Sequence, residues 1–346
     1  HDDLDSNFDL FLDINKHNTL NDYLSLYDFE PLEFIEEKHR RMMLSVGSSN
    51  PPWKHVLPTR IYSKKIDDLH AFLKNMKGVT TNRYSNIFSE GNEILQNLNR
   101  FCPNENLLKK SIENATVSKT IQSFRPQKDG LTSRIEYNRF KTVTGRLVVK
   151  SGPQVLLLPR EMKNIFKSRY ENGKILWIDF VSLEPRLAKL MTSNSAKEDI
   201  YNDIIEEYKL TYSRKKVKAA VLSTLFGAGI SKLTEIVGKE AIIIKKAIDE
   251  YFDLKSILKK TGDFKSGKIK NYFGRPITLK RNTANIAVNN FIQSTGVDVS
   301  LFGFSKISKK MPSSFKPLAV VHDALVADVN NFDLEEVCKI VKEGVD

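Results

Sequence analysis

A short apolar run that ends in a carboxylate constrains this chain more than any other feature of its sequence. Residues 176–178, Leu-Trp-Ile, predict a buried strand, and Asp179 ends it. Ser182 then predicts the N-cap of a helix whose first turn holds Glu184 and a proline. A buried carboxylate is costly unless it is paired or bound to a metal, so Asp179 is a helix cap, a core ion-pair partner or a metal ligand.

Composition narrows the class of protein and its partners. With 346 residues, 40% of them hydrophobic and 28% charged, the chain is globular and long enough for two or three subdomains. Its formal net charge of +12 favours a polyanionic partner, nucleic acid first and an anionic membrane surface second. A generally lysine-rich proteome would give the same charge, so charge alone does not establish that the partner is a polyanion.

Cysteine usage and the termini indicate the setting in which the chain works. Only Cys102 and Cys338 are present, which excludes a disulfide framework and a zinc site and favours a reducing, intracellular compartment. We expect a cytoplasmic protein, with a viral protein in its host cell included. No apolar run reaches membrane-spanning length, and no signal peptide is visible. Because the chain starts at His1 and stops just after a helical pattern, we expect a fragment or a processed chain.

Most other segments predict helices. Residues 1–80 carry amphipathic patterns at Leu20–Phe34 and Ile66–Met76, broken by a loop at Gly47–Pro52, and hold no catalytic constellation. Residues 84–124 predict helices with lysine and arginine side chains on their surface. These side chains are equally consistent with binding to a phosphate backbone and with a solvated face. Further helices are predicted at Asp199–Tyr208 and 239–260, and residues 268–279 predict two strands around a turn.

The second key element is the helix predicted within residues 211–227. Arg214, Lys218, Leu222 and Phe226 are each four residues apart and therefore share one face, and Ser213 predicts the N-cap. An apolar row lies beside that face, at Val217, Val221 and Leu225. Two cations followed by two apolar groups suit a ligand with phosphates at one end and a flat base at the other. An ordinary amphipathic helix with a basic first half is the alternative.

Three more segments place polar groups where a partner can approach. Residues 133–147 predict a strand, a turn at Gly145 and a strand, which presents Arg146 just after the glycine. A helix predicted at 282–304 carries Asn289 and Gln293 four residues apart, a spacing that suits minor-groove readout or plain polar surface. Apolar runs at 317–329 predict a β-hairpin with His322 and Asp323 near its tip, where a second carboxylate reaches a sheet edge.

Together these elements match the apparatus of in-line nucleotidyl transfer, in which two carboxylates hold a pair of Mg²⁺ ions about 4 Å apart. In this combination the sequence resembles the polymerase portion of family A DNA polymerases, the DNA polymerase I type. The Asp179 segment, Asp-Phe-Val-Ser-Leu-Glu-Pro-Arg, resembles the family's Asp-Tyr-Ser-Gln-Ile-Glu-Leu-Arg pattern. The segments that match the family's motifs follow its order and are Thr144–Leu147, Asp179–Arg186, Arg214–Gly227, Gln293–Asp298 and His322–Ala324.

The resemblance implies an α+β fold, a right-hand polymerase with an antiparallel palm sheet and helical fingers and thumb. The expected divisions are an N-terminal region of unknown role at 1–80, a thumb at 81–130, the palm at 131–190 and 276–346, and fingers at 191–275. The implied activity is template-directed DNA polymerase. The implied partners are primer–template DNA and dNTPs, with no membrane and a monomeric chain. Proofreading is not expected, because no Asp-x-Glu motif lies in a context long enough for an exonuclease domain.

The resemblance also implies site roles. Asp179 and Asp323 are expected to be catalytic and, with the Phe180 backbone carbonyl, to hold two Mg²⁺ ions, Mn²⁺ being an alternative. Glu184 is expected to crowd the sugar 2′ position and so to favour deoxynucleotides. The residues expected to bind the nucleotide are Arg214, Lys218, Leu222, Phe226, Glu184 and Tyr201. Those expected to bind primer–template DNA are Arg146, Asn289, Gln293 and His322.

Departures from the family's motifs leave two alternatives. Ala324 replaces an auxiliary Glu, Leu222 replaces an aromatic residue, Tyr201 replaces a His and Asn285 replaces an Arg. These changes allow a non-catalytic relative that binds primer–template DNA, although retention of both aspartates, Arg214 and Lys218 speaks against it. RNA synthesis is the other alternative, and Glu184 speaks against that one. A plain basic structural protein would not explain the order of the motifs.

Overall fold

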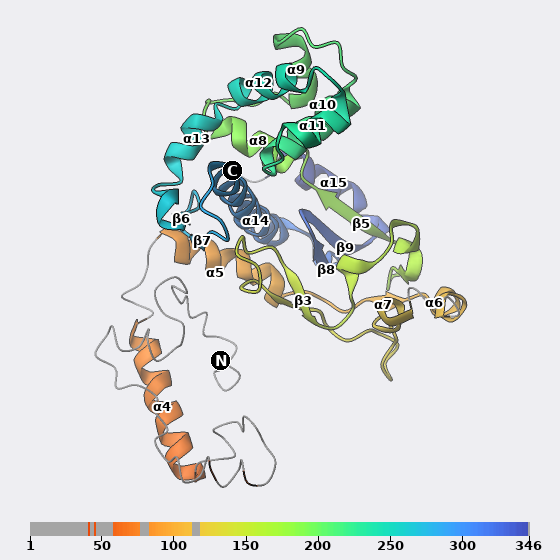
Figure 1. Cartoon of the computed structure of the whole chain (residues 1–346). Helices are drawn as coiled ribbons and strands as arrows, with labels where there is room; N and C mark the ends of the chain where they lie inside the picture. The colour runs from red at the N-terminus through yellow and green to blue at the C-terminus, as the bar shows by residue number, and fades with distance from the viewer. Residues whose placement is uncertain (1–40, 42–44, 46–57, 77–82, 113–117, 345–346) are drawn as a thin grey trace. The chain divides into compact units, whose positions relative to one another are not determined.

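The computed structural model describes residues 41, 45, 58–76, 83–112 and 118–344, and Figure 1 shows the helices and strands that they form. The chain divides into two compact units, His1–Asn86 and Ile87–Asp346. All of the segments that resemble polymerase motifs lie in the second unit. The site can therefore be built from that unit alone.

The first unit contains one of the predicted amphipathic segments. Helix α4 (Thr59–Met76) includes the pattern predicted at Ile66–Met76, which confirms that element. The predictions for Leu20–Phe34 and for the loop at Gly47–Pro52 lie outside the described residues. Across the part of the chain that the structure describes, no helix is both long and apolar enough to cross a membrane.

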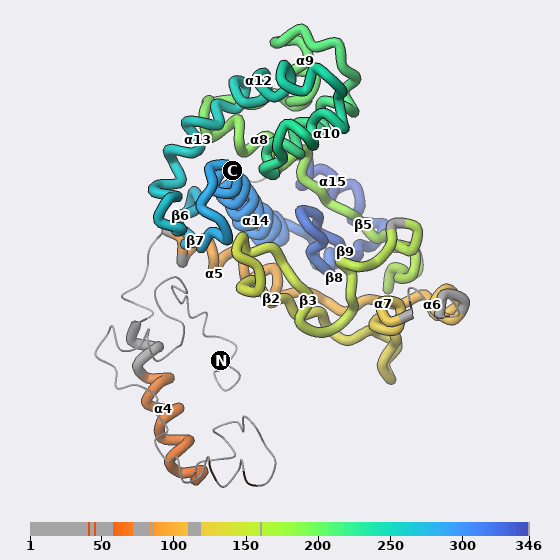
Figure 2. The backbone as a smooth tube through the Cα atoms, in the orientation of Figure 1, coloured from red at the N-terminus to blue at the C-terminus, as the bar shows by residue number. Residues whose placement is uncertain are grey.

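A three-stranded antiparallel sheet forms the centre of the second unit. Its order is β5–β9–β8, from β5 (Gly173–Asp179), β8 (Lys316–Val321) and β9 (Ala324–Asn330). Strands β5 and β9 are far apart in sequence but lie side by side (Figure 2). The β8–β9 pair confirms the predicted hairpin. Residues 176–178 form a strand as predicted, but they are half-buried and not buried, because β5 is an edge strand with a neighbour on one side only.

The two faces of this sheet are covered by different parts of the unit. Alternate residues of a strand point to opposite faces, so neighbours in β9 contribute to different cores. Leu325 and Ala327 pack with α14 (Ala284–Lys310) and α15 (Leu334–Glu343). Val326 instead joins an aromatic cluster on the other face. The rings of that cluster are Phe101, Phe124 and Phe166, with centroids 4.6–6.1 Å apart.

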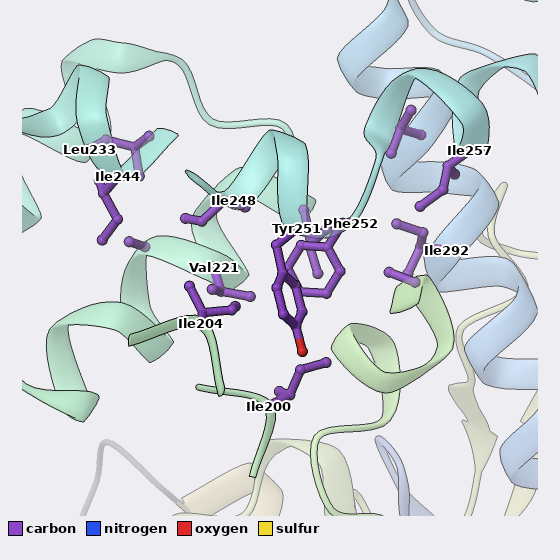
Figure 3. Close-up of a cluster of buried hydrophobic side chains, with 14 of the residues drawn as sticks. Ile200, Ile204, Val221, Leu233, Ile244, Ile248, Tyr251, Phe252, Ile257 and Ile292 are labelled. Carbon is purple, nitrogen blue, oxygen red and sulfur yellow. The ribbon is translucent and has the colours of Figure 1, made fainter. Parts of the chain in front are cut away.

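A second, helical core lies over the first half of α14 (Figure 3). Its apolar groups come from every third or fourth position of each helix, as expected for helices that bury one face. The helices that build it are α8 (Leu183–Leu190), α9 (Ile200–Glu207), α10 (Arg214–Leu225), α11 (Ile230–Val237), α12 (Ala241–Tyr251) and α13 (Leu254–Lys260). Because α14 contributes Phe291 here and Phe304 to the sheet core, this one helix ties the helical core to the sheet.

Two details of these helices differ from the prediction. The single helix predicted at 239–260 is two helices, because Asp253 adopts a left-handed backbone (φ 42°) and caps α13 by accepting from the Ser256 amide. Asp253 thus starts a new helix, although the apolar periodicity of residues 239–260 continues past it. Ser182 and Ser213 do occupy the N-cap positions of α8 and α10, but neither side chain caps its helix.

Smaller elements complete the unit. The antiparallel pair formed by Lys268–Lys270 and Pro276–Thr278 confirms the two strands predicted at 268–279. Of the strand–turn–strand predicted at 133–147, the first strand is confirmed, but its partner, Val148–Ser151, begins just beyond the predicted range. The remaining strands are β1 (Cys102–Pro103), β2 (Glu136–Asn138), β3 (Val148–Ser151), β4 (Phe166–Lys167), β6 (Lys268–Lys270) and β7 (Pro276–Thr278). The remaining helices are α5 (Arg83–Gln96), α6 (Glu105–Ile112), α7 (Ser118–Gln122), η2 (Val155–Leu157), η3 (Arg160–Ile165), η4 (Phe264–Ser266) and η5 (Asn331–Asp333).

One side chain closes part of the outer edge of the sheet. The Tyr137 hydroxyl, on β2, donates to the Val320 carbonyl (2.7 Å) and accepts from the Val320 amide (3.1 Å). Both main-chain groups of Val320 on the outer side of β8 are therefore satisfied by a single hydroxyl. Burial raises the pKa of Tyr137 well above its usual value, so this hydroxyl keeps its proton and its donor role.

Candidate active site

The β5–β9 pairing brings together the two aspartates that the sequence singled out. Asp179 is the last residue of β5 and lies opposite Ala324, the first residue of β9. Asp323 precedes Ala324 at the tip of the hairpin, where His322 takes a left-handed backbone (φ 58°) that turns the chain. Two carboxylates from distant parts of the sequence thus meet at one end of the sheet.

The charges of these aspartates interact. Burial and the negative charge of Asp323 raise the pKa of Asp179 above its usual value. The positive charges of Lys163 and Lys218 act in the opposite direction. A raised pKa means that the ionised pair is held at an electrostatic cost, which a divalent cation between the carboxylates would remove.

The residues at this sheet end fit part of the coordination shell of a Mg²⁺ ion. Among the described residues, no group of three or more His, Cys, Asp or Glu side chains is placed to hold a metal ion. Two carboxylates therefore have to be completed by oxygens of backbone, water or phosphate, which is how Mg²⁺ is commonly bound. Phe180, the expected backbone ligand, is fixed by its ring, which packs 5.3 Å from that of Phe304, next to Gly303. This donor set suits Mg²⁺ or Mn²⁺.

Glu184 lies in the first turn of α8 and forms an ion pair with Arg146, with 3.5 Å between Oε1 and Nη2. Burial raises the pKa of Glu184, and the charge of Asp323 adds to the rise, while Arg146 opposes it. The Arg146 guanidinium also lies 5.7 Å from the centre of the Phe226 ring. Arg146 therefore contacts both Glu184 and Phe226, two residues predicted to bind the nucleotide.

Helix α10 carries the two cations of the site as predicted. Arg214 and Lys218 are both exposed, and the apolar row beside them is buried. The Arg214 Nε donates to Asp199 Oδ2 at 2.8 Å, which holds the pKa of Asp199 below its usual value. No carboxylate in the described part of the chain lies within ion-pair distance of Lys218. Its ammonium remains available to an anionic ligand.

Tyr201 lies beneath these cations. The centre of its ring is 5.2 Å from Arg214 and 5.7 Å from Lys218, and its side chain is 1% exposed. Burial raises the pKa of Tyr201, and the neighbouring Ser182 side chain, at the start of α8, opposes that rise. Tyr201 thus packs against both cations from the buried side, and its expected part in nucleotide binding stays a prediction.

The remaining predicted residues lie at the end of α10, on α14 and at the hairpin tip. The Asn289 amide on α14 donates to the Phe226 carbonyl (3.0 Å), which fixes the end of α10. The Asn289 Oδ1 is buried and has no hydrogen-bond partner among the residues that the structure describes. Gln293 is half-buried one turn further along α14, and His322 is exposed at the hairpin tip. Leu222 and Phe226 end the α10 face, and 38% of the Phe226 side chain is exposed.

Sequence reasoning missed two residues near the site. Asp199 was assigned only to the start of a helix, but it both caps α9 and holds Arg214. Its position as an acid directly before an apolar pattern was a usable signal for the cap. Lys163 lies 3.4 Å above the Trp177 ring on β5, and nothing in its local sequence indicates that the chain returns there.

Comparison with known proteins identifies the family. The family model described as DNA polymerase family A matches residues 60–346. No curated protein matches the sequence. Among solved structures, a similar one is the POL domain of Pol1 from M. smegmatis, in complex with DNA primer-template and dNTP, with a TM-score of 0.51 and 17% sequence identity. The match covers 68% of this chain and 51% of that chain, so this chain spans about half the length of that relative. The chain belongs to DNA polymerase family A.

Proposed function

We propose that this chain is a template-directed DNA polymerase that transfers a nucleotidyl group from a dNTP to a primer 3′-hydroxyl. The observation that carries the proposal is the meeting of Asp179 and Asp323 at one sheet end, where the positive charge of Lys218 on α10 also acts on Asp179. The match to a polymerase captured with DNA primer-template and dNTP supports it. In this reading the β5–β9–β8 sheet is the palm, α9–α13 are the fingers, and residues 81–130 form the thumb.

In this reaction the protein forms no covalent bond with the substrate and acts by positioning and electrostatic stabilisation. The primer 3′-oxygen attacks the α-phosphorus, the bond to the β-phosphate oxygen breaks, and pyrophosphate leaves as the hydroxyl loses its proton. Bound Mg²⁺ ions would lower the pKa of that hydroxyl and neutralise the charge that develops on the leaving group. Asp179, Asp323 and the Phe180 carbonyl would hold these ions. Arg214 and Lys218 would bind the triphosphate.

The other site residues would position the base pair and the sugar. Phe226 would stack near the templating base, because its ring is exposed at the end of α10. Glu184, held by its ion pair with Arg146, would fill the space of a 2′-hydroxyl. Asn289 and Gln293 on α14, with His322 at the hairpin tip, would contact the primer end. Leu222 would contact the nucleotide sugar.

Primer extension tests the proposal directly. The wild-type chain should extend a primer with dNTPs and Mg²⁺, and Asp179→Ala and Asp323→Ala should each lower the rate by about 10³-fold or more. Asp129→Ala is a matched control, because it removes an exposed acid whose partner, Arg100, lies away from the site. Wild-type rates in either aspartate variant would overturn the assignment of the site.

A second candidate is a relative that binds primer–template DNA without extending it. It is favoured by Ala324, which is buried directly opposite Asp179 where the family's auxiliary Glu would stand. Such a protein would bind primer–template DNA in an anisotropy titration but add no nucleotide with Mg²⁺ or Mn²⁺. The two carboxylates, whose ionised forms repel each other, have no purpose in that protein, because DNA binding alone does not need them.

A competition between dNTPs and NTPs distinguishes DNA synthesis from RNA synthesis. If Glu184 fills the space of a 2′-hydroxyl, dNTPs should be incorporated in strong preference to NTPs. Glu184→Ala should raise NTP incorporation relative to dNTP incorporation by at least about 10-fold, because it removes a steric block and leaves the metal carboxylates in place. A wild-type preference for NTPs would contradict this role of Glu184.

A further inference from the structure

A cluster of buried charges lies close to the turn that carries Arg146. The Asp298 side chain, on α14, is 0% exposed, and its Oδ1 lies 3.1 Å from Arg139 Nη2 and 4.0 Å from Arg275 Nη1. Asn271 donates to the other oxygen of Asp298 at 2.6 Å. Burial raises the pKa of Asp298, and the two guanidinium charges oppose that rise. Burying an acid with two arginines is costly, so the cluster calls for an explanation beyond stability.

One arginine of this cluster takes the place of a side chain at Gly145. A Cβ atom at Gly145 would lie 1.6 Å from Arg275 Nη1 and 2.4 Å from its Cζ, so the guanidinium occupies that space. The left-handed backbone of Gly145 (φ 77°) favours glycine as well. Arg275 Nη2 also donates to the Arg139 carbonyl at 3.1 Å. Arg275 therefore touches both ends of the segment 139–145.

The held segment leads directly into the site. The Gly145 amide donates to the Thr142 carbonyl (3.1 Å), and the Thr142 hydroxyl donates to the Arg146 carbonyl (2.9 Å). This compact turn ends at Arg146, whose guanidinium meets Glu184. A displacement of Gly145 would thus move Arg146 relative to the carboxylate that faces the sugar position.

We propose that Asp298, Arg139 and Arg275 form a positioning cluster that fixes Arg146 against Glu184 by clamping the turn at Gly145. The proposal rests on the function proposed above, in which Arg146 contacts the primer end. It assigns Asp298 a purpose that apolar packing would not serve. The Arg275 guanidinium fills the space that a side chain at position 145 would take, and two buried guanidinium groups need a buried counter-charge. None of the three residues touches substrate in this account.

The test is a double-mutant cycle built on Arg275→Lys, which keeps the charge and removes the planar fork. Alone it should lower kcat/KM for dNTP addition by about 10-fold, as expected when a contact group is misplaced. In an Arg146→Ala background, Arg275→Lys should cost less than about 2-fold, because both changes act through the same side chain. Arg169→Lys is the matched control, since Arg169 pairs with buried Asp328 (3.2 Å) away from Gly145. Its effect should be the same in both backgrounds.

Hydrogen exchange gives a readout that needs no activity. In the free protein, the Gly145 amide should exchange at least about 5-fold faster in Arg275→Lys than in wild type, while Arg169→Lys leaves it unchanged. Unchanged exchange, or fully additive losses with Arg146→Ala, would overturn the positioning cluster even if wild type extends primers. A wild type that extends no primer would instead overturn the proposed function, and exchange would still test the clamp. Should Arg275→Lys fail to fold, Arg139→Gln breaks the ion pair with Asp298 and serves the same cycle.

Discussion

Asp179 and Ala324 are cross-strand partners at the end of the β5–β9 ladder, so their side chains leave the same face of the sheet. Residues directly opposite in this way have Cβ atoms about 5 Å apart. A carboxylate at position 324 would therefore stand beside Asp179 and, through the hairpin tip, beside Asp323. Because the side chain of Ala324 is a methyl group, Asp179 and Asp323 are the two carboxylates expected to bind metal at this sheet end. A single substitution at position 324 can add a third carboxylate there.

Ala324→Glu should make the protein more dependent on divalent cations. Without metal, a third carboxylate adds repulsion to an already strained pair, and Tm should fall by about 2–4 °C. Added Mg²⁺ should raise Tm more in this variant than in wild type, because the ion neutralises the added charge. Ala324→Gln is the control for size, and it should show the wild-type response to Mg²⁺. Equal Mg²⁺ effects in the Glu and Gln variants would contradict a metal site at this sheet end.

Asp179→Asn should abolish primer extension and yet stabilise the free protein. Because the folded pKa of Asp179 is raised, its ionised form destabilises the fold at neutral pH, and the amide removes that charge. We expect Tm to rise by about 1–2 °C in the absence of metal. Asp129→Asn should instead lower Tm. Arg100 lowers the pKa of Asp129, so the negative charge of the Asp129 carboxylate stabilises the fold. A lower Tm in Asp179→Asn would show that this carboxylate is not held at a cost.

The pH dependence of extension should reflect the raised pKa values of Asp179 and Glu184. Each group favours its protonated form more in the folded protein than in the unfolded chain, so its destabilising effect fades as pH falls through the folded pKa. Activity changes in the opposite direction, since metal binding needs ionised carboxylates. The rate should fall with acidification at a pH above the usual carboxylate range, and higher Mg²⁺ concentrations should move that fall to lower pH. An acid limb that does not respond to Mg²⁺ would argue against the aspartates as its source.

Asp199→Asn should weaken nucleotide binding without disturbing the helix that Asp199 begins. Asparagine caps a helix about as well as aspartate, so α9 should keep its start, while Arg214 loses its ionic partner. Since exposed ion pairs contribute about 1 kcal/mol or less, KM for dNTP should rise about 2- to 5-fold with little change in kcat. Asp253→Asn is the matched control, because Asp253 caps α13 and pairs with no cation of the site. Equal KM changes in both variants would exclude a role through Arg214.

The sequence predicted those parts of the fold that depend on local patterns. Apolar runs of strand length gave the β8–β9 hairpin, and the four-residue spacing on α10 gave the exposed cations beside a buried row. Asp253 broke a helix that hydrophobic periodicity carries straight through, because capping acts on one residue while periodicity averages over many. Ser182 and Ser213 show the reverse case, in which the residue type suits a cap but the side chain makes no capping bond.

Contacts between distant segments were beyond the sequence. Asp179 and Asp323 were expected to meet only because a family resemblance supplied the pairing of their strands. Other contacts depend on how helices and turns pack together, and the spacing of residues in the sequence does not encode that packing. Examples are the contact of Arg146 with Glu184, the position of Lys163 over Trp177 and the burial of Tyr201. The half-buried state of β5 likewise follows from its place at the sheet edge, which strand composition does not specify.

The bond between Tyr137 and Val320 has a consequence for the behaviour of the protein in concentrated solution. A strand edge with open amide and carbonyl groups is a template on which another chain can add a strand and begin to aggregate. A single phenol from β2 occupies both groups of Val320, so a three-stranded sheet is shielded there without a fourth strand. Tyr137→Phe keeps the ring and removes this shield, and the outer edge of β8 is where self-association should then begin.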